Sequence, residues 1–407
     1  MKKISVLALV FGMAFTAWGQ TMKIHQKAVT VAVPASEAGK MTYGADGTTL
    51  TIMGKTYTIS EIDSITVDRS IVKANTVTVD YQGNRAHVLV AGNVAPNMVV
   101  TAHAADVSVV VDASWQQEIF YTLKGQTSEG SFFMDGEYKS TVTLDNLTLN
   151  NSDGAAIDIA NGKRIDVIVP HGTTTTLSDG KGLQKACFFV NGHPELSGGG
   201  TLLLTGNSRH AFASDEYTRI KPDFGMLKVL QSIGDGLHIK QYFKMQGGTI
   251  EIANTSGDCI DVEKTTNPLD ADNGKVFIDN GSLKMRVTAD DVKGLKCDSD
   301  MTLSGGTIEA GVIGLGTKGV SVGGNLLVQQ KTAVPTKIVM AVTGTTFKPK
   351  DPVLESKCRG IKGKGNFVFD GGDIQISATG KKSKAISIDG SYTYKSGTIN
   401  CPVDANK

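Results

Sequence analysis

Apolar and polar residues alternate with a period of two through most of the chain, in short segments such as LHI, IDV and TIEI. This period is typical of β-strands and excludes helical repeats of similar length. A small residue followed by an apolar one recurs at intervals of 25, 23, 35, 25, 41 and 25 residues. The pairs are Ala211-Phe212, Gly236-Leu237, Cys259-Ile260, Gly294-Leu295, Gly319-Val320, Gly360-Ile361 and Ala385-Ile386.

A second marker keeps the same period: a glycine that introduces a short run such as GGTIEI or GGDIQI. It falls at Gly200, Gly225, Gly248, Gly281, Gly306, Gly324, Gly372 and Gly397. Two short strands per repeat cannot bury an apolar face alone, but stacked repeats can. The markers therefore predict an all-β fold, a right-handed parallel β-helix with coils of about 23–25 residues, in which each glycine supplies the positive φ of a corner.

The first residues differ from the rest. Residues 1–19 have two lysines, an apolar run and the small-x-small site AWG, which together predict a secretory signal peptide. We expect export to the periplasm, the cell surface or the medium, and no later apolar run is long enough to span a bilayer. Residues 20–68 predict a small N-terminal β module, and residues 69–403 predict the β-helix, whose first coils are less regular.

Charge and cysteine content narrow the class of protein. The chain has 407 residues, 41 Lys and Arg against 40 Asp and Glu, and a net charge of +1, so nothing points to nucleic acid. Its five cysteines are scattered. Cys259, Cys297 and Cys401 fall at inward positions, which favours buried packing, although one disulfide between adjacent coils stays open. Aromatic residues are 6% of the chain, and Tyr217, Tyr242, Tyr392 and Tyr394 are candidate stacking rings.

Two repeats are longer than the others. The 35-residue interval contains EKTTNPLDADNG at 263–274, and the 41-residue interval contains a proline-bearing stretch at 330–357. Extra residues in a solenoid emerge at a corner and often border a binding face. We therefore expect the functional surface beside these insertions.

Stacked coils place equivalent residues about 4.8 Å apart, so they form columns. The residue before each small-apolar pair forms a first column: His210, Asp235, Asp258, Lys293, Lys318, Arg359 and Lys384. The residue after the pair forms a second column: Ala213, His238, Asp261, Lys296, Ser321, Lys362 and Ser387. The columns are acidic in the middle and basic towards the C-terminus.

The acidic part of the columns suggests a cation site. Carboxylates placed this close repel each other unless a cation neutralises them. Calcium accepts six to eight oxygens in flexible geometry, so it is the expected ion. The predicted ligands are Asp235, Asp258, Asp261, Asp291 and Asp298. The alternative is a solvated face with Asp–Lys pairs, and the chain has no EF-hand or nonapeptide calcium repeat.

The basic part of the columns would follow a linear anion along the coil axis, and a polysaccharide that carries carboxylates fits such a surface. The predicted substrate-binding residues are His210, His238, Lys293, Lys296, Lys318, Arg359 and Lys362. The alternative is that these side chains only keep the strands soluble.

An ordered succession of motifs over residues 118–401 resembles an exported carbohydrate-binding β-helix family, similar in architecture to polysaccharide lyases. The motifs include TVTLDNLTLNNSDGAAIDI, SRHAFASDEY, GDGLHI, GDCIDV and DDVKGLKCDSDMTLSGGTIEA. The resemblance implies bound calcium and sugar binding by the β-helix, without established catalysis. Asp179, Asp235 and Asp258 match the family's acidic positions, whereas Thr175 stands where its turn usually has Asn, and the later coils lack the Asp-Gly pair.

We therefore expect an exported, monomeric, non-catalytic protein that binds acidic, uronate-containing polysaccharide such as pectin with calcium. One alternative is a calcium-dependent lyase with Lys293 or Lys296 as base, although neighbouring aspartates keep lysines protonated. A glycosidase would need two carboxylates across a cleft, with Asp290, Asp291, Asp298 and Asp300 as candidates in type only. A structural surface protein or adhesin is the third alternative, because fold alone does not choose a function.

Overall fold

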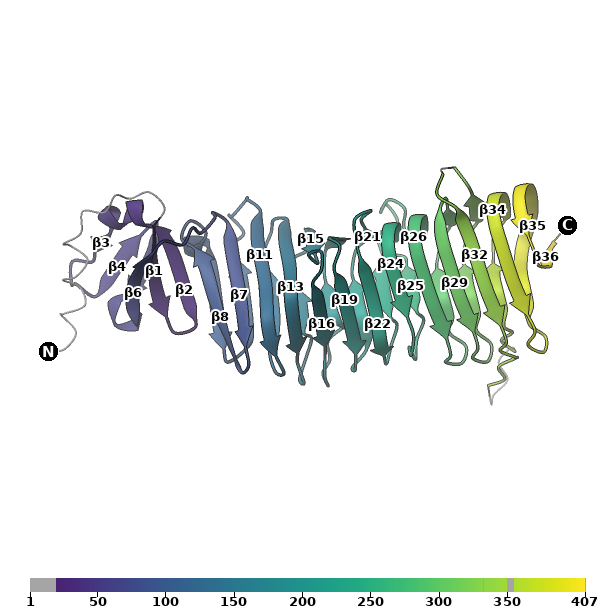
Figure 1. Cartoon of the computed structure of the whole chain (residues 1–407), viewed down its shortest axis with the longest axis horizontal. Helices are drawn as coiled ribbons and strands as arrows, with labels where there is room; N and C mark the ends of the chain where they lie inside the picture. Colours follow the sequence, from purple (N-terminus) through teal and green to yellow (C-terminus); the bar gives the residue numbers. More distant parts are fainter. Residues whose placement is uncertain (1–19, 332, 350–354, 407) are drawn as a thin grey trace.

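The computed structural model describes residues 20–331, 333–349 and 355–406. The chain winds into a long stack of coils, and the first and last strands, β1 (Thr21–Gln26) and β36 (Val403–Asn406), lie at opposite ends of the stack (Figure 1). From β11 (Ile119–Thr127) onwards, successive coils are joined by parallel strand pairs, which confirms the predicted all-β solenoid. The predicted signal peptide lies outside the described residues.

Three groups of strands run along the solenoid, and we call them the first, second and third faces. The first face consists of β9 (Met98–His103), β10 (Asp106–Val111), β12 (Ser131–Asp135), β14 (Ile157–Ile159), β17 (Ala186–Val190), β20 (His210–Ser214), β23 (Leu237–Lys240), β25 (Ile260–Glu263), β27 (Lys293–Cys297), β30 (Lys318–Val322), β33 (Arg359–Gly363), the start of β35 (Lys384–Ile399) and β36 (Val403–Asn406).

The other two faces share several long strands that bend from one face to the next. Their strands are β11 (Ile119–Thr127), β13 (Ser140–Asn150), β15 (Arg164–Ile168), β16 (Thr174–Ser178), β18 (His193–Ser197), β19 (Thr201–Gly206), β21 (Thr218–Ile220), β22 (Met226–Ser232), β24 (Tyr242–Ile252), β26 (Lys275–Val287), β28 (Met301–Leu303), β29 (Gly306–Val312), β31 (Leu326–Gln329), β32 (Thr336–Val342), β34 (Phe367–Ala378) and the later part of β35. The second face includes β15, β18, β21, β28 and β31, and the third face includes β16, β19, β22, β29 and β32.

Each regular coil has three strands, so the prediction of two strands per repeat was wrong. One coil runs through β20, β21 and β22, and the next coil pairs with all three in parallel through β23 and β24. The extra strand escaped the sequence pattern because it is short. β21 has only three residues, too few to display an alternation.

The predicted alternation builds the core. In β23, Leu237 and Ile239 are buried, while His238 and Lys240 are partly exposed on the outer surface. The same pattern in every coil produces one continuous hydrophobic interior from Met22 to Ile388. Four of the five cysteines are buried, and all five are free thiols, so they pack as predicted and form no disulfide in the described structure.

The corner glycines are needed for two different reasons. Gly248 and Gly306 have positive φ values of 71° and 83°, as predicted. Gly225 does not, and the sequence-based explanation was wrong there. A Cβ at Gly225 would lie 2.2 Å from the carbonyl oxygen of Gly200 in the preceding coil. Close approach of two backbones, and not an unusual φ, therefore requires glycine at this corner.

The N-terminal residues are hydrogen-bonded to the solenoid. They form β1 (Thr21–Gln26), β2 (Val29–Pro34), β3 (Thr42–Tyr43), β4 (Thr49–Ile52), β5 (Lys55–Thr58), β6 (Ser64–Asp68) and the 3-10 helices η2 (Ala35–Lys40) and η3 (Ile59–Glu61), followed by β7 (Thr76–Gln82), β8 (Arg85–Ala91) and η4 (Ala95–Asn97). β2 pairs in parallel with β8, so the sheet of the module continues into the first coils. β3, β4 and β5 form a small separate antiparallel sheet.

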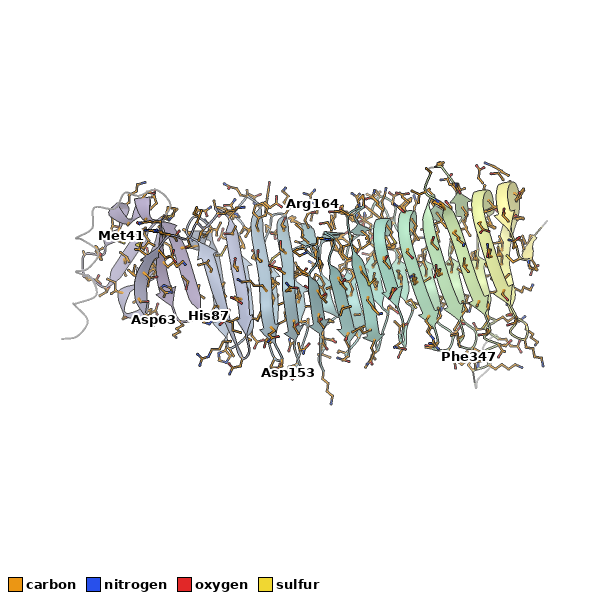
Figure 2. All side chains as sticks on the ribbon, in the orientation of Figure 1. Met41, Asp63, His87, Asp153, Arg164 and Phe347 are labelled. Carbon is orange, nitrogen blue, oxygen red and sulfur yellow. The ribbon has the colours of Figure 1, made fainter. Side chains whose placement is uncertain are left out.

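The two insertions emerge at different corners. Residues 264–274 join β25 to β26, between the first and second faces. The stretch 330–357 is not one insertion as predicted, because β32 lies inside it and continues the third face. The extra residues follow β32 and carry an isolated bridge between Phe347 and Ser356. Figure 2 shows Phe347 at the lower edge of the solenoid. Among the described residues, no helix is long and apolar enough to cross a membrane.

Candidate functional site

The first face carries both predicted columns in the predicted register. In the second column, His238 pairs with Asp261, and Asp261 pairs with Lys296. In the first column, Lys293 pairs with Lys318, and Lys318 pairs with Arg359. The register follows from the pleat, because a slip by one residue would bury these charges and expose the core.

Two histidines and an aspartate form a compact cluster in the middle of this face. Nδ1 of His238 lies 3.0 Å from Oδ2 of Asp235, and the His210 ring stacks on the His238 ring with centroids 4.4 Å apart. Nδ1 of His210 accepts the backbone N–H of Asp235 at 3.0 Å and also lies 3.2 Å from Oδ2. Because Nδ1 of His210 accepts this N–H, it carries no proton and cannot donate to Oδ2 of Asp235. We therefore assign the proton that faces Oδ2 to Nδ1 of His238.

The pKa shifts in this cluster favour charged forms. Burial lowers the pKa of His238, but the hydrogen bond to Asp235 and the charges of Asp235, Glu263 and Asp261 outweigh burial, so the pKa is raised. Burial raises the pKa of Asp235, yet the hydrogen bonds from His238 and from the backbone N–H of Asp258 hold it well below its usual range. The pair is therefore an imidazolium and a carboxylate, largely shielded from solvent.

Lys296 sits among three carboxylates on the same face. Its Nζ lies 2.9 Å from Oδ1 of Asp261, 3.9 Å from Oε1 of Glu263 and 4.0 Å from Oδ1 of Asp298. Burial opposes the charge of Lys296, but the hydrogen bond to Asp261 and the surrounding carboxylates raise its pKa. The ammonium group of Lys296 is thus the cation that neutralises this acidic patch.

The five aspartates predicted as calcium ligands do not converge. Within the described part of the chain, candidate ligand atoms gather in two groups only: His210, Asp235 and His238, and then His238, Asp261 and Glu263. Asp258 instead accepts the backbone N–H of Lys293 at 2.7 Å, and Asp291 accepts the Ser356 hydroxyl at 2.5 Å. Calcium needs six to eight oxygens, whereas imidazoles and an ammonium group fill this surface. These residues do not fit a calcium ion, so no step below depends on one.

The predicted basic residues differ in how free they are. Arg359 is only 9% exposed and donates to the carbonyl oxygens of Cys358 and Lys382. Lys318 donates to the Gly316 carbonyl oxygen at 2.7 Å and to the Ser356 hydroxyl, and burial lowers its pKa.

The other two basic residues lie at the surface. Lys362 forms an ion pair with Asp389, whereas among the described residues Nζ of Lys293 has one hydrogen-bond partner, the backbone oxygen of Asp291 at 3.0 Å. Of the predicted column, Lys293 is the cation most available to a ligand.

The sequence interpretation missed a third outward column. Glu263 lies 3.6 Å from Nε2 of His238, and Asp215 lies between Lys185 and Lys240. Each follows a predicted column by two residues, so the outward parity of the strand was the available signal. Together the three columns give the first face alternating acidic and basic groups at strand spacing.

A model of the family "carbohydrate-binding domain-containing protein" matches residues 105–403, more than half of the chain. The chain belongs to this carbohydrate-binding family. A solved structure, the gadolinium derivative of a polysaccharide lyase-like protein from C. thermocellum, is similar with a TM-score of 0.52. The match has 18% identity and covers 65% of this chain and 99% of the other, which shows a shared fold alone. A search of curated proteins finds no match.

Aromatic rings could supply sugar contacts in a carbohydrate-binding family, but two of the predicted rings are covered. Tyr217 and Tyr242 stack on each other with centroids 4.7 Å apart and an interplanar angle of 13°. The Arg219 guanidinium lies 4.7 Å from the Tyr217 centroid, and His193 packs on the same ring. A sugar stacks only on an open ring face. These tyrosines therefore stabilise the corner of the coil, while Tyr394 is 55% exposed.

We predict that Asp258→Asn flattens the pH dependence of stability. Burial raises the pKa of Asp258 to about 6 from 3.8, although Lys293 opposes the shift. The folded chain therefore binds this proton more tightly than the unfolded chain, so stability falls as pH rises from about 4 to about 6. Relative to the parent, the variant should gain about 2 kcal/mol across that window. Denaturant titrations at about pH 4 and about pH 6 measure this gain in stability. Asp389→Asn is the control at an exposed carboxylate. If stability changes equally with pH in the parent and in Asp258→Asn, the prediction is wrong.

Proposed function

We propose that the first face binds an extended polysaccharide and does not cleave it. Membership of the carbohydrate-binding family supports a carbohydrate ligand. The observation that carries the proposal is the set of three parallel columns, which place carboxylates, imidazoles and ammonium groups along the first face at strand spacing. The second and third columns point outward, whereas His210, Asp258 and Arg359 of the first column are largely buried. Such a surface offers both donors and acceptors to the hydroxyl groups of a chain laid along the coils. The predicted export agrees with an extracellular ligand.

The first column becomes basic from Lys293 onwards, and this end of the face is suited to binding the carboxylate of a uronate residue. Lys293 has no carboxylate partner among the described residues, so its ammonium group can pair with an incoming carboxylate. Lys318 and Arg359 follow in the same column and add positive potential. At the other end, the basic groups Lys185, Lys240 and His238 already contact Asp215 or Glu263, so they are less available to an acidic group. The proposed ligand is therefore a polysaccharide with uronate residues at the Lys293 end.

The site chemistry favours binding over elimination. A lyase base must lose its proton near neutral pH, but the carboxylates around Lys296 raise its pKa. Lys318 has a lowered pKa, yet its Nζ already donates to Gly316 and Ser356. Lys293, the other predicted base, donates its Nζ to the backbone oxygen of Asp291 at 3.0 Å. None of the three lysines is poised to accept a substrate proton, so we expect no cleavage.

The test is gel retardation by polygalacturonate, with and without a chelator, while ultraviolet absorbance follows any unsaturated product. Lys293→Glu should weaken retardation about tenfold, because it replaces one charge-assisted contact by repulsion. Lys384→Glu is the matched control, since Lys384 lies in the same column but already pairs with Asp404. We expect chelator to change nothing and absorbance to stay flat. Unsaturated product would overturn the proposal in favour of a lyase, and no retardation by any polysaccharide would favour a structural role.

A further inference from the structure

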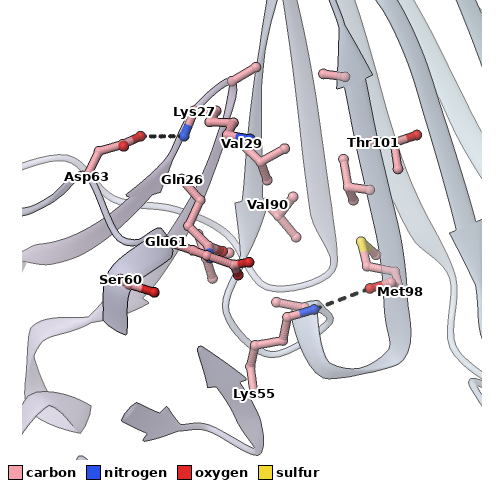
Figure 3. Close-up of a pocket in the computed structure, with 15 residues that line it drawn as sticks. Gln26, Lys27, Val29, Lys55, Ser60, Glu61, Asp63, Val90, Met98 and Thr101 are labelled. Carbon is pink, nitrogen blue, oxygen red and sulfur yellow. Dashed lines mark hydrogen bonds between the residues drawn. The ribbon is translucent and has the colours of Figure 1, made fainter. Parts of the chain in front are cut away.

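A cavity of about 650 Å³ lies between the N-terminal module and the first coils, far along the chain from the first-face site (Figure 3). Its floor is aliphatic, with Val31 and Val90 buried and Val29 partly buried. Its rim is polar and carries Lys55 and Glu61 among other residues. The carbohydrate-binding proposal makes no use of this cavity.

One wall of the cavity is the edge of a sheet. β9 is the first strand of the first face, and it pairs only with β10 in the described structure. In an antiparallel pair, alternate residues direct their N–H and C=O groups away from the partner strand. Nζ of Lys55 lies 3.5 Å from the carbonyl oxygen of Met98, so Met98 is one of these residues. Val100 and Ala102 follow at a period of two, and all three line the cavity.

We propose that this cavity binds an extended polypeptide segment of another protein, which adds to the first face as a strand beside β9. Met98, Val100 and Ala102 would supply the backbone hydrogen bonds, as in other cases of strand addition. The inward side chains of the added strand would contact the valine floor, which selects aliphatic residues at alternate positions.

The charge of the rim selects one further feature of the partner. The Lys27 backbone N–H donates to Asp63 at 2.5 Å, and Lys55 is directed at β9, so both groups are engaged. Glu61 is exposed and forms no ion pair within the described part of the chain, and the same holds for the exposed ammonium group of Lys27 on the rim. A basic residue on the added strand would complement Glu61. No aromatic ring is among the described lining residues, and the floor is aliphatic, so a polypeptide fits better than a sugar.

The experiment uses the full chain and a fluorescent peptide of alternating valine and threonine with a lysine at each end. We expect saturable binding by fluorescence anisotropy. Val100→Pro should weaken it about tenfold, because proline removes an outward N–H while the bonds to β10 remain. Val99→Thr is the matched control: Val99 is 65% exposed, does not line the cavity and should bind the peptide normally. Glu61→Lys should also weaken binding through repulsion of the peptide lysines.

A second probe keeps the test informative if Val100→Pro fails to fold. The same peptide with alternate amides N-methylated cannot form the ladder, so it should bind at least about tenfold more weakly to the unmodified chain. Absence of saturable binding, or equal binding of both peptides, would overturn the proposal. Two further results would also overturn the proposal. If the unmodified chain self-associates and Val100→Pro does not, the occupant of the cavity is a second copy of the chain. If Val100→Pro loses retardation by polygalacturonate, the cavity binds a sugar. The first-face proposal is tested independently, by the effect of Lys293→Glu on retardation by polygalacturonate.

Discussion

Lys296→Met is expected to destabilise the solenoid by about 3 kcal/mol, because it leaves a buried carboxylate without its cation. Asp261 is 6% exposed, and the Lys296 ammonium group, 2.9 Å away, is its ion-pair partner. Glu263 and Asp298 would then lie near Asp261 without the ammonium group between them, and His238, which contacts Glu263 at 3.6 Å, would be the remaining basic group beside them. Denaturant titration near neutral pH measures the loss as a lower midpoint. The expected loss of stability is large because the Asp261 carboxylate is shielded from water, and solvent would therefore screen its charge only weakly.

Lys362→Met is the matched control for this prediction. Lys362 occupies the same column further along the solenoid, but its partner Asp389 is 57% exposed. An exposed pair of this kind contributes at most about 1 kcal/mol. The double variant Lys296→Met with Asp261→Asn should recover much of the lost stability, since it removes the unpaired charge. If Lys296→Met costs no more than Lys362→Met, then Lys296 is not the cation on which the acidic patch depends.

The columns could be predicted because burial fixes their register. Each small-apolar pair has its apolar residue in the core, so the residue directly after the pair points to the opposite side of the strand in every coil. Asp261 and Lys296 are 35 residues apart in the chain, yet counting from these pairs placed them side by side. The same counting located His238 above Asp261. Strand pairing in a solenoid thus turns a sequence spacing into a spatial contact.

The charge state of the columns could not be predicted, because it depends on side-chain contacts. The sequence showed an acidic stretch and a basic stretch, which suggested calcium for one and an anion for the other. In the structure, Lys296 reaches back to Asp261, and His238 donates to Asp235. Arg359 turns to backbone carbonyl groups and is buried. Only the positions of individual atoms reveal that Lys293 forms no ion pair with a described carboxylate.

The second face was missed for a different reason. Its strands can be as short as β28, which has three residues, and the sequence pattern of a short strand merges with that of the turn beside it. The glycine marker was noticed, but it was attributed to φ alone. At Gly225 the constraint lies between coils, and a single chain segment gives no sign of what will pack against it. Contacts between coils therefore explain both the missed strand and the misread glycine.

Gly225→Ala is expected to cost about 3 kcal/mol or more, because no neighbouring side chain can move aside for the new methyl group. Its Cβ would meet only backbone atoms of the preceding coil, with the Gly200 carbonyl oxygen at 2.2 Å. Gly162→Ala is the matched control, since the nearest neighbour of its Cβ is Nδ2 of Asn191 at 3.6 Å. Thermal unfolding of both variants measures the difference. Equal melting temperatures would show that the coils can separate at this corner, and the register that aligns the first-face columns would then need another explanation.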